Sequence, residues 1–84
     1  MAEEHDRFGY TPDGRFATVQ TAIDIEAALG FIESVKGDDE AAHSYEDELW
    51  ERVLVLISEG HPNAQRMAAQ ALRTKQIKFA RWCA

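Results

Sequence analysis

The sequence predicts a small, mainly α-helical domain in which a three-helix bundle follows an N-terminal β-hairpin. Two observations predict this fold class. Apolar residues recur at intervals of three and four along 24–36, 40–59 and 62–82, which is the spacing of one helix face. Near the N-terminus, a turn-forming cluster around Pro12 lies between aromatic residues, which is typical of a hairpin. The length of 84 residues leaves room for a single domain, 1–84.

The hairpin is expected over residues 8–16, after a polar and acidic stretch, residues 1–7, that we expect to be a flexible tail. Pro12 presets the φ angle of the first turn position, and Gly14 supplies the positive φ that closes the turn. The aromatic residues on either side would then pair across two strands. Because an isolated hairpin is only marginally stable, it has to pack on the helices that follow.

The first helix is expected over 24–36. Asp24 is a good N-cap, and Gly37 follows the last turn, where glycine is favoured. The apolar side chains share one face of this segment, which predicts that this face lies against the core. They are Ile25, Ala28, Leu29, Ile32 and Val35.

The second helix is expected over 40–59, with a start between Asp38 and Ser44. Asp38 or Asp39 can cap it, and Ser44 is a weaker alternative. Gly60 marks its end. Its apolar face is unusually broad, which predicts the central helix of the bundle. This face consists of Ala42, Tyr45, Leu49, Val53 and Leu56, widened by Trp50, Leu54 and Ile57.

The third helix is expected over 62–82, with Pro62 at its first position. Lys75 falls within its apolar face, and burying an unpaired lysine is costly. Three solutions are open: the side chain reaches solvent past the core edge, an acid from the second helix meets it, or the helix bends near Thr74. The apolar face consists of Ala64, Met67, Ala68, Ala71, Leu72, Phe79 and Trp82.

The connections between these helices are short, so sequential helices are expected to be antiparallel neighbours. We therefore expect three apolar residues of the second helix to be buried against Ile32 and Leu72. The three residues are Leu49, Val53 and Leu56.

The charge of the chain is divided. All fifteen acidic residues lie between Glu3 and Glu59, together with four basic residues, which gives this part a net charge of −11. The last 24 residues contain five basic residues and no acidic one, which gives them +5 and the whole chain −6. Because summed surface charge steers encounters between macromolecules, this asymmetry predicts a charged partner.

An acidic face on the second helix is the candidate partner-binding site. Carboxylates near a helix N-terminus are stabilised by the helix dipole, so capping explains several of them. The alternative is that spaced carboxylates imitate phosphates and compete for the lysines and arginines of a nucleic-acid-binding protein. The residues proposed for this face are Asp39, Glu40, Asp47, Glu48 and Glu51.

A basic face on the third helix is the alternative site, because a row of cations can follow the phosphates of a nucleic acid. The competing interpretation is that these residues neutralise the acidic helices within the fold. The residues of this face are Arg66, Arg73, Lys78 and Arg81.

No motif for catalysis, for metal binding or for a cofactor is visible. The three histidines are dispersed, and Cys83 has no second cysteine with which to form a ligand pair or an intrachain disulfide. The serines lack a recognisable nucleophile motif. The acidic N-terminus does not resemble a signal peptide, and no apolar stretch approaches the ~20 residues that span a bilayer. We therefore expect a cytoplasmic protein that is not an enzyme and has no cofactor.

The sequence thus favours a small acidic interaction protein that binds and modulates a macromolecular partner. A phage or mobile-element inhibitor of a nucleic-acid-handling complex, anti-CRISPR-like in role, is the leading hypothesis. A small nucleic-acid-binding regulator and a homo-oligomeric structural component are the alternatives. If Trp50, Leu54 and Val55 form one exposed patch, a partner or a second copy is expected there, and a homodimer is one outcome.

Overall fold

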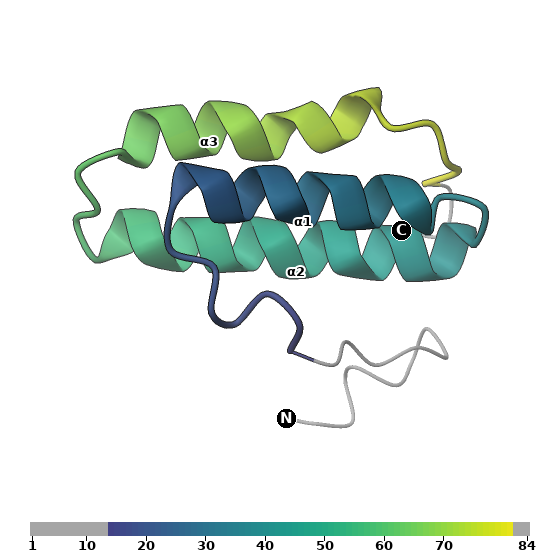
Figure 1. Ribbon diagram of the computed structural model, residues 1–84, viewed down its shortest axis with the longest axis horizontal. Helices are drawn as coiled ribbons and strands as arrows, with labels where there is room; N and C mark the ends of the chain where they lie inside the picture. Colours follow the sequence, from purple (N-terminus) through teal and green to yellow (C-terminus); the bar gives the residue numbers. More distant parts are fainter. Residues whose placement is uncertain (1–13, 82–84) are drawn as a thin grey trace.

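The computed structural model describes residues 14–81, and these form three α-helices that pack together (Figure 1). Helix α1 spans Ala22–Ser34, α2 spans Asp39–Ser58 and α3 spans Ala64–Leu72. A 3-10 helix, η2, continues α3 over Arg73–Gln76. Successive helices run in opposite directions, as the short connections require. The mainly helical fold class and the three-helix bundle are therefore confirmed.

The predicted N-terminal hairpin is not supported. Its first part, residues 8–13, lies outside the described residues, and residues 14–81 contain no strand. Gly14 does have a positive φ, 73°, as the turn interpretation requires. After it, however, the backbone turns again instead of extending. The N–H of Ala17 donates to the carbonyl of Gly14 at 3.0 Å, and that of Val19 donates to the carbonyl of Phe16 at 3.1 Å.

Phe16 explains why this segment departs from a hairpin. Its side chain is only 3% exposed and packs on the helices. The ring meets Phe31 of α1 and Tyr45 of α2 edge-on, with centroid distances of 6.3 and 5.8 Å. Its backbone N–H donates to Glu48 Oε2 of α2 at 2.9 Å. The aromatic pairing expected between two strands is therefore made with two helices.

Helix α1 begins earlier than predicted, because Thr21 and not Asp24 is the N-cap. Thr21 Oγ1 accepts the N–H of Asp24 at 3.1 Å, and the carboxylate of Asp24 accepts the N–H groups of Gln20 and Thr21 at 2.9 and 3.1 Å. This reciprocal arrangement is a capping box. The N–H of Gln20 contributes most to lowering the pKa of Asp24, and the hydroxyl and N–H of Thr21 lower it further.

The core lies where the three helices meet, and α1 and α2 supply most of its residues. Ile32, Leu49, Val53 and Leu56 are buried there, as predicted. Leu72 is not, and the prediction for it was wrong: it is 58% exposed. Helix α3 turns Met67 and Ala71 towards the core. Leu72 follows Ala71 by about 100° around the helix, which carries its side chain to the surface.

The third helix is much shorter than the predicted 62–82. It begins after Asn63 rather than at Pro62, tightens into η2, and gives way at Ile77 to extended backbone. Thr74 follows Met67 by seven residues and Ala71 by three, so it lies on the core face and is fully buried. Lys75 is exposed, and its ammonium lies 6.0 Å from the ring centroid of Trp50. Of the three solutions open for Lys75, the observed one is that the side chain reaches solvent past the core edge.

The residues just before α1 are held by two side chains at the end of the bundle where α2 finishes and α3 begins. Arg52 of α2 donates from Nε to the carbonyl of Val19 at 2.8 Å. His61, in the connection between α2 and α3, contacts the carbonyl of Gln20 through Nε2 at 2.7 Å. Its Nδ1 accepts the N–H of Asn63 at 3.0 Å, so Nε2 must carry the proton. These bonds fix where α1 starts relative to the other two helices.

Two glycines should respond in opposite ways to the same substitution. A Cβ added at Gly14 or Gly30 would meet no heavy atom of residues 14–81 within 4 Å, so only the backbone distinguishes them. Gly14→Ala should destabilise the domain by roughly 1–2 kcal/mol, because φ is positive there. Gly30→Ala, inside α1, should stabilise it by about 0.5–1 kcal/mol. Denaturant unfolding of both variants measures this, and shifts of the same sign would contradict it.

Candidate partner-binding surface

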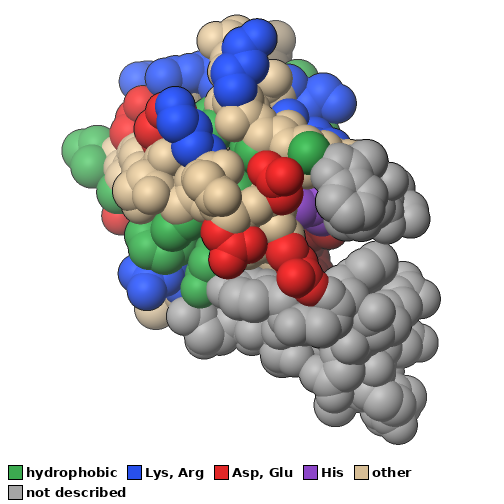
Figure 2. All heavy atoms as spheres, turned by 90° about the vertical axis from the view of Figure 1, so that its right-hand side faces the viewer, with side chains coloured by type: hydrophobic (Ala, Val, Ile, Leu, Met, Phe, Trp, Pro, Cys, Tyr) green, Lys and Arg blue, Asp and Glu red, His purple; other side chains and the backbone are tan. Residues whose placement is uncertain are grey.

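The side of α2 that faces away from the core carries three exposed carboxylates, those of Glu40, Asp47 and Glu51. Their spacing of seven and four residues places them on one helix face. Figure 2 views the molecule from the end where α1 finishes and α2 begins. Acidic side chains gather in the middle of this end, and most of the basic side chains in view lie above them, on the side of α3. One basic group also lies below them, at the lower left, so the charge division of the sequence is only partly a division in space.

Asp47 has a neighbour that partly balances its charge. Its Oδ2 lies 3.3 Å from Nε2 of His43, one turn earlier on α2, while 64% of its side chain stays exposed. Partial burial raises the pKa of Asp47; the charge of Glu46 adds to this, and His43 opposes it. A positive group brought close would favour the ionised form. Cation binding and ionisation of Asp47 therefore support each other.

Two of the five predicted acidic residues also serve the fold. Oδ1 of Asp39 accepts the N–H of Ala80 at 3.1 Å and so ties the C-terminal segment to the start of α2. Glu48 accepts the N–H of Phe16 through Oε2, and its other oxygen is buried without a hydrogen-bond partner. The helix N-cap itself is Asp38, whose Oδ1 accepts the N–H of Ala41 at 3.1 Å. The structure thus separates Asp39 and Glu48 from the outward-facing carboxylates.

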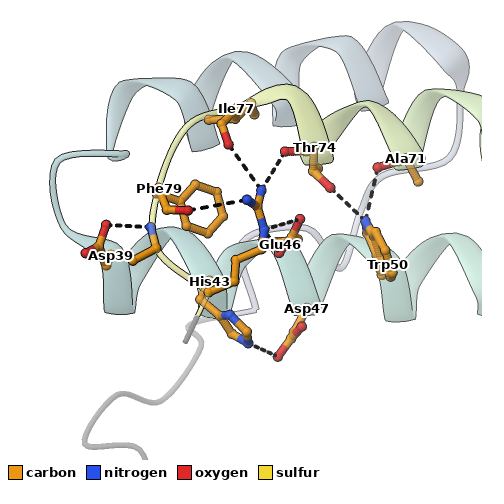
Figure 3. A network of polar contacts seen from close by, with 11 residues as sticks. Asp39, His43, Glu46, Asp47, Trp50, Ala71, Thr74, Ile77 and Phe79 are labelled. Carbon is orange, nitrogen blue, oxygen red and sulfur yellow. Dashed lines mark hydrogen bonds and ion pairs between the residues drawn. The ribbon is translucent and has the colours of Figure 1, made fainter. Parts of the chain in front are cut away.

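Arg81, proposed for the alternative basic face, is turned into the molecule. Its Nε donates to both carboxylate oxygens of Glu46, at 2.9 and 3.2 Å. Its Nη2 donates to the carbonyls of Thr74 and Ile77 at 2.6 and 3.3 Å, and Nη1 donates to that of Phe79 at 3.4 Å. These acceptors converge on one guanidinium group (Figure 3). Arg81 therefore supplies donors to carbonyls at and just after the end of η2; that of Thr74 also accepts the N–H of Ile77 at 3.0 Å.

Glu46 is the acceptor that sequence reasoning missed. Only 4% of this residue is exposed, although it stands within the acidic run of α2. The sequence did contain a signal for the burial of Glu46. It follows Ala42 by four residues and precedes Leu49 by three, which is the spacing of the core face of the helix. A buried carboxylate needs a cationic partner. The sequence contained that partner at Arg81, but nothing local connects the two positions.

Trp50 makes a second polar link close to this pair. Its indole Nε1 donates to the carbonyl of Ala71 and to Oγ1 of Thr74, both at 3.0 Å (Figure 3). The ring therefore lies between α2 and the junction of α3 with η2. Together with the guanidinium of Arg81, the indole fixes the position of Thr74 against the centre of α2.

Arg73, also proposed for the basic face, pairs with Glu26 of α1. Gln70 donates to the same oxygen of Glu26 at 2.9 Å and to the carbonyl of Ala22 at 3.1 Å. The hydrogen bond from Gln70 contributes most to lowering the pKa of Glu26, and Arg73 and the charge of Arg66 lower it further. Arg73 and Arg66 thus face α1. Lys78, the fourth residue of that face, is exposed.

Comparisons of this chain with models of protein families, with curated proteins and with solved structures found no match. Within residues 14–81, no group of three or more histidine, cysteine, aspartate or glutamate side chains could hold a metal ion. No helix in this range is long and apolar enough to cross a membrane. The function therefore has to be argued from the surface of the bundle itself.

Removing the cation from the buried pair should destabilise the domain strongly. Arg81→Met leaves Glu46 buried without its partner, and breaking a buried pair in this way costs about 3 kcal/mol or more. The double variant Glu46→Leu/Arg81→Met should recover much of this loss, because no buried charge remains. Thermal unfolding of both variants tests the pair. A single variant as stable as the wild type would contradict it.

Acid should weaken the fold through Asp24 and Glu26. Both pKa values are lower in the folded state, so the unfolded chain binds more protons as the pH falls. Their stabilisation is present above the ordinary values of 3.8 and 4.5, and is lost as the pH drops through the folded-state pKa values. Melting temperatures between about pH 6 and pH 2.5 should therefore fall less steeply for Asp24→Asn/Glu26→Gln than for wild type. An equal slope in the variant and the wild type would contradict this assignment.

Proposed function

We propose that this chain is a non-enzymatic interaction protein that binds a basic surface of a macromolecular partner through the outer face of α2. One observation carries the proposal. The fold uses arginines of the C-terminal part internally, whereas the outer carboxylates of α2 are left to solvent. Arg73 is paired with Glu26, and Arg81 is paired with Glu46. The side-chain carboxylates of Glu40 and Glu51 make no hydrogen bond or ion pair with any residue of the described range.

A charge that serves no internal contact is available to a partner. Exposed carboxylates on one helix face add their fields, so they speed the approach of a positive surface and orient it. Asp47 lies between Glu40 and Glu51 on this face, with 64% of its side chain exposed, and a nearby cation would favour its ionised form. The face therefore suits a partner that presents several lysines or arginines.

A shallow hollow of about 250 Å³ beside this face suits one such side chain. Glu48 and Glu51 supply carboxylates to its lining, and Phe16 and Val55 supply apolar surface. Arg52 also lines it, with its Nε engaged by the carbonyl of Val19. Lysine and arginine have an apolar stem and a charged head, so they can use both kinds of surface at once.

Within this function, we propose a nucleic-acid-handling complex as the partner. Such complexes hold phosphates with lysine and arginine, and a row of carboxylates competes for the same cations. A small acidic inhibitor encoded by a phage or another mobile element, anti-CRISPR-like in role, fits this chemistry. The alternative of direct nucleic-acid binding is less favoured, because two of its four candidate residues, Arg73 and Arg81, are engaged within the fold.

The test compares charge reversals on the two faces. Glu40→Lys/Glu51→Lys should weaken partner binding at least tenfold, mainly by slowing association, and should leave thermal stability close to wild type. The matched control Arg66→Glu/Lys78→Glu changes the same number of exposed charges on the basic side and should still bind. Partners are first captured from the native host with the wild type and both variants. Association rates are then measured with the purified partner.

A second measurement addresses the proposed class of partner. The wild-type chain should displace a labelled oligonucleotide from the captured partner, and the acidic-face variant should not. Direct binding of the oligonucleotide by the chain, with an affinity that falls steeply with salt and is lost in the Arg66→Glu/Lys78→Glu variant, would overturn the proposal in favour of a nucleic-acid-binding regulator.

A further inference from the structure

An apolar strip follows the seam between α2 and α3. On α2, apolar residues recur at 50, 54 and 57, and on α3 they recur at 64, 68 and 72. Two leucines of this strip are largely uncovered: Leu54 is 64% exposed and Leu72 is 58% exposed. We call these six residues the seam strip; they are Trp50, Leu54, Ile57, Ala64, Ala68 and Leu72.

The hydrogen bonds of Trp50 fix how the two rows align. Its indole donates to Ala71 and Thr74, so Trp50 of α2 lies beside the C-terminal end of α3. Because α2 and α3 run in opposite directions, Leu54 is level with Ala68, one turn further along. About one turn from Trp50 in the opposite direction along α2, Asp47 is level with Lys75, at the same height along the bundle. The ammonium of Lys75 lies 6.0 Å from the ring centroid of Trp50, in agreement with this register.

We propose that the seam strip is the contact between two copies of this chain. A single exposed leucine is common on protein surfaces. Two exposed leucines along one seam, next to the small side chain of Ala68, instead form an apolar surface on which a pair of helices can pack. A second copy supplies such a pair. This inference goes beyond the proposed function and does not depend on it, because none of the six residues of the seam strip belongs to the acidic face; only Asp47 enters both.

Charge decides how the two copies are oriented. A two-fold axis parallel to the helices places α2 of one copy on α3 of the other and keeps each residue at its own level. Asp47 of each copy then lies opposite Lys75 of the other. A two-fold axis across the helices would instead oppose α2 to α2 and bring the acidic faces of two chains of net charge −6 together. The parallel axis is therefore the arrangement that electrostatics allows.

The resulting contact is a four-helix arrangement in which every neighbour is antiparallel. Within one copy, α2 and α3 are antiparallel, and across the axis each α2 also meets an α3 that runs the other way. Such up-and-down packing is a common solution for four helices. Only two helices per copy take part, so the contact is small, and we expect a dissociation constant in the micromolar range, roughly 1–100 μM.

Sedimentation velocity over a concentration series tests the dimer, with reductant present so that Cys83 cannot form a disulfide. The wild type should change from monomer to dimer. Leu54→Lys and Leu72→Lys should each raise the dissociation constant at least tenfold, because each removes an apolar side chain from the contact. The control is Ile23→Lys, which changes an even more exposed apolar residue, 80% exposed, on α1. It should dimerise like the wild type.

A charge exchange tests the orientation. Asp47→Lys and Lys75→Asp should each weaken self-association, and an equimolar mixture of the two variants should form a mixed dimer that restores it. Circular dichroism checks that every variant is folded. A wild type that stays monomeric at millimolar concentration would overturn the inference and leave another protein as the occupant of the strip. Equal weakening by Ile23→Lys, or no rescue in the mixture, would overturn the proposed contact.

Discussion

The burial of one carboxylate, that of Glu46, constrains the whole C-terminal part of the structure. Removing an ionised carboxylate from water is costly unless a cation and hydrogen bonds replace the water. Arg81 supplies the cation, and it can do so only because the chain leaves helical geometry after Gln76 and folds back over α2. The same guanidinium then satisfies the carbonyls of Thr74 and Ile77. One buried charge thus explains both the end of η2 and the course of the last described residues.

This constraint also changes the meaning of the divided charge. In the sequence, the acidic part is the preferred candidate surface and the basic part is the alternative. In the fold, Arg73 and Arg81 cross to Glu26 and Glu46, so part of the charge is neutralised between helices. Glu40 and Glu51 on the acidic side, and Arg66 and Lys78 on the basic side, stay exposed. Internal pairing therefore takes up two of the four candidate basic residues, whereas the outer face of α2 keeps its row of carboxylates for a partner.

The sequence predicted what local chemistry determines. Asp38 was among the predicted caps of α2, and Gly60 follows its end with a positive φ of 84°, because capping and glycine conformations depend on a few adjacent residues. The burial of Leu49 and Val53 followed from helical spacing. The partners of Glu46 and Phe16 could not be predicted, because they are 35 and 32 residues away along the chain. Both contacts exist only once the helices have packed.

Leu72 and Lys75 show why the predicted core failed at the end of α3. A continuous α-helix would place both on one apolar face, and sequence spacing assumes such a helix. In the structure, the core face of this segment is the one that carries Met67, Ala71 and Thr74, and the hydroxyl of Thr74 accepts the indole N–H of Trp50. Lys75 reaches solvent, and Leu72 lies on the flank beside α2. The true core face is therefore narrower than the predicted one, and Leu72, which it leaves uncovered, joins Leu54 in the seam strip. An apolar residue that the pattern assigns to the core, but that the core does not cover, marks the surface where another chain can complete the burial.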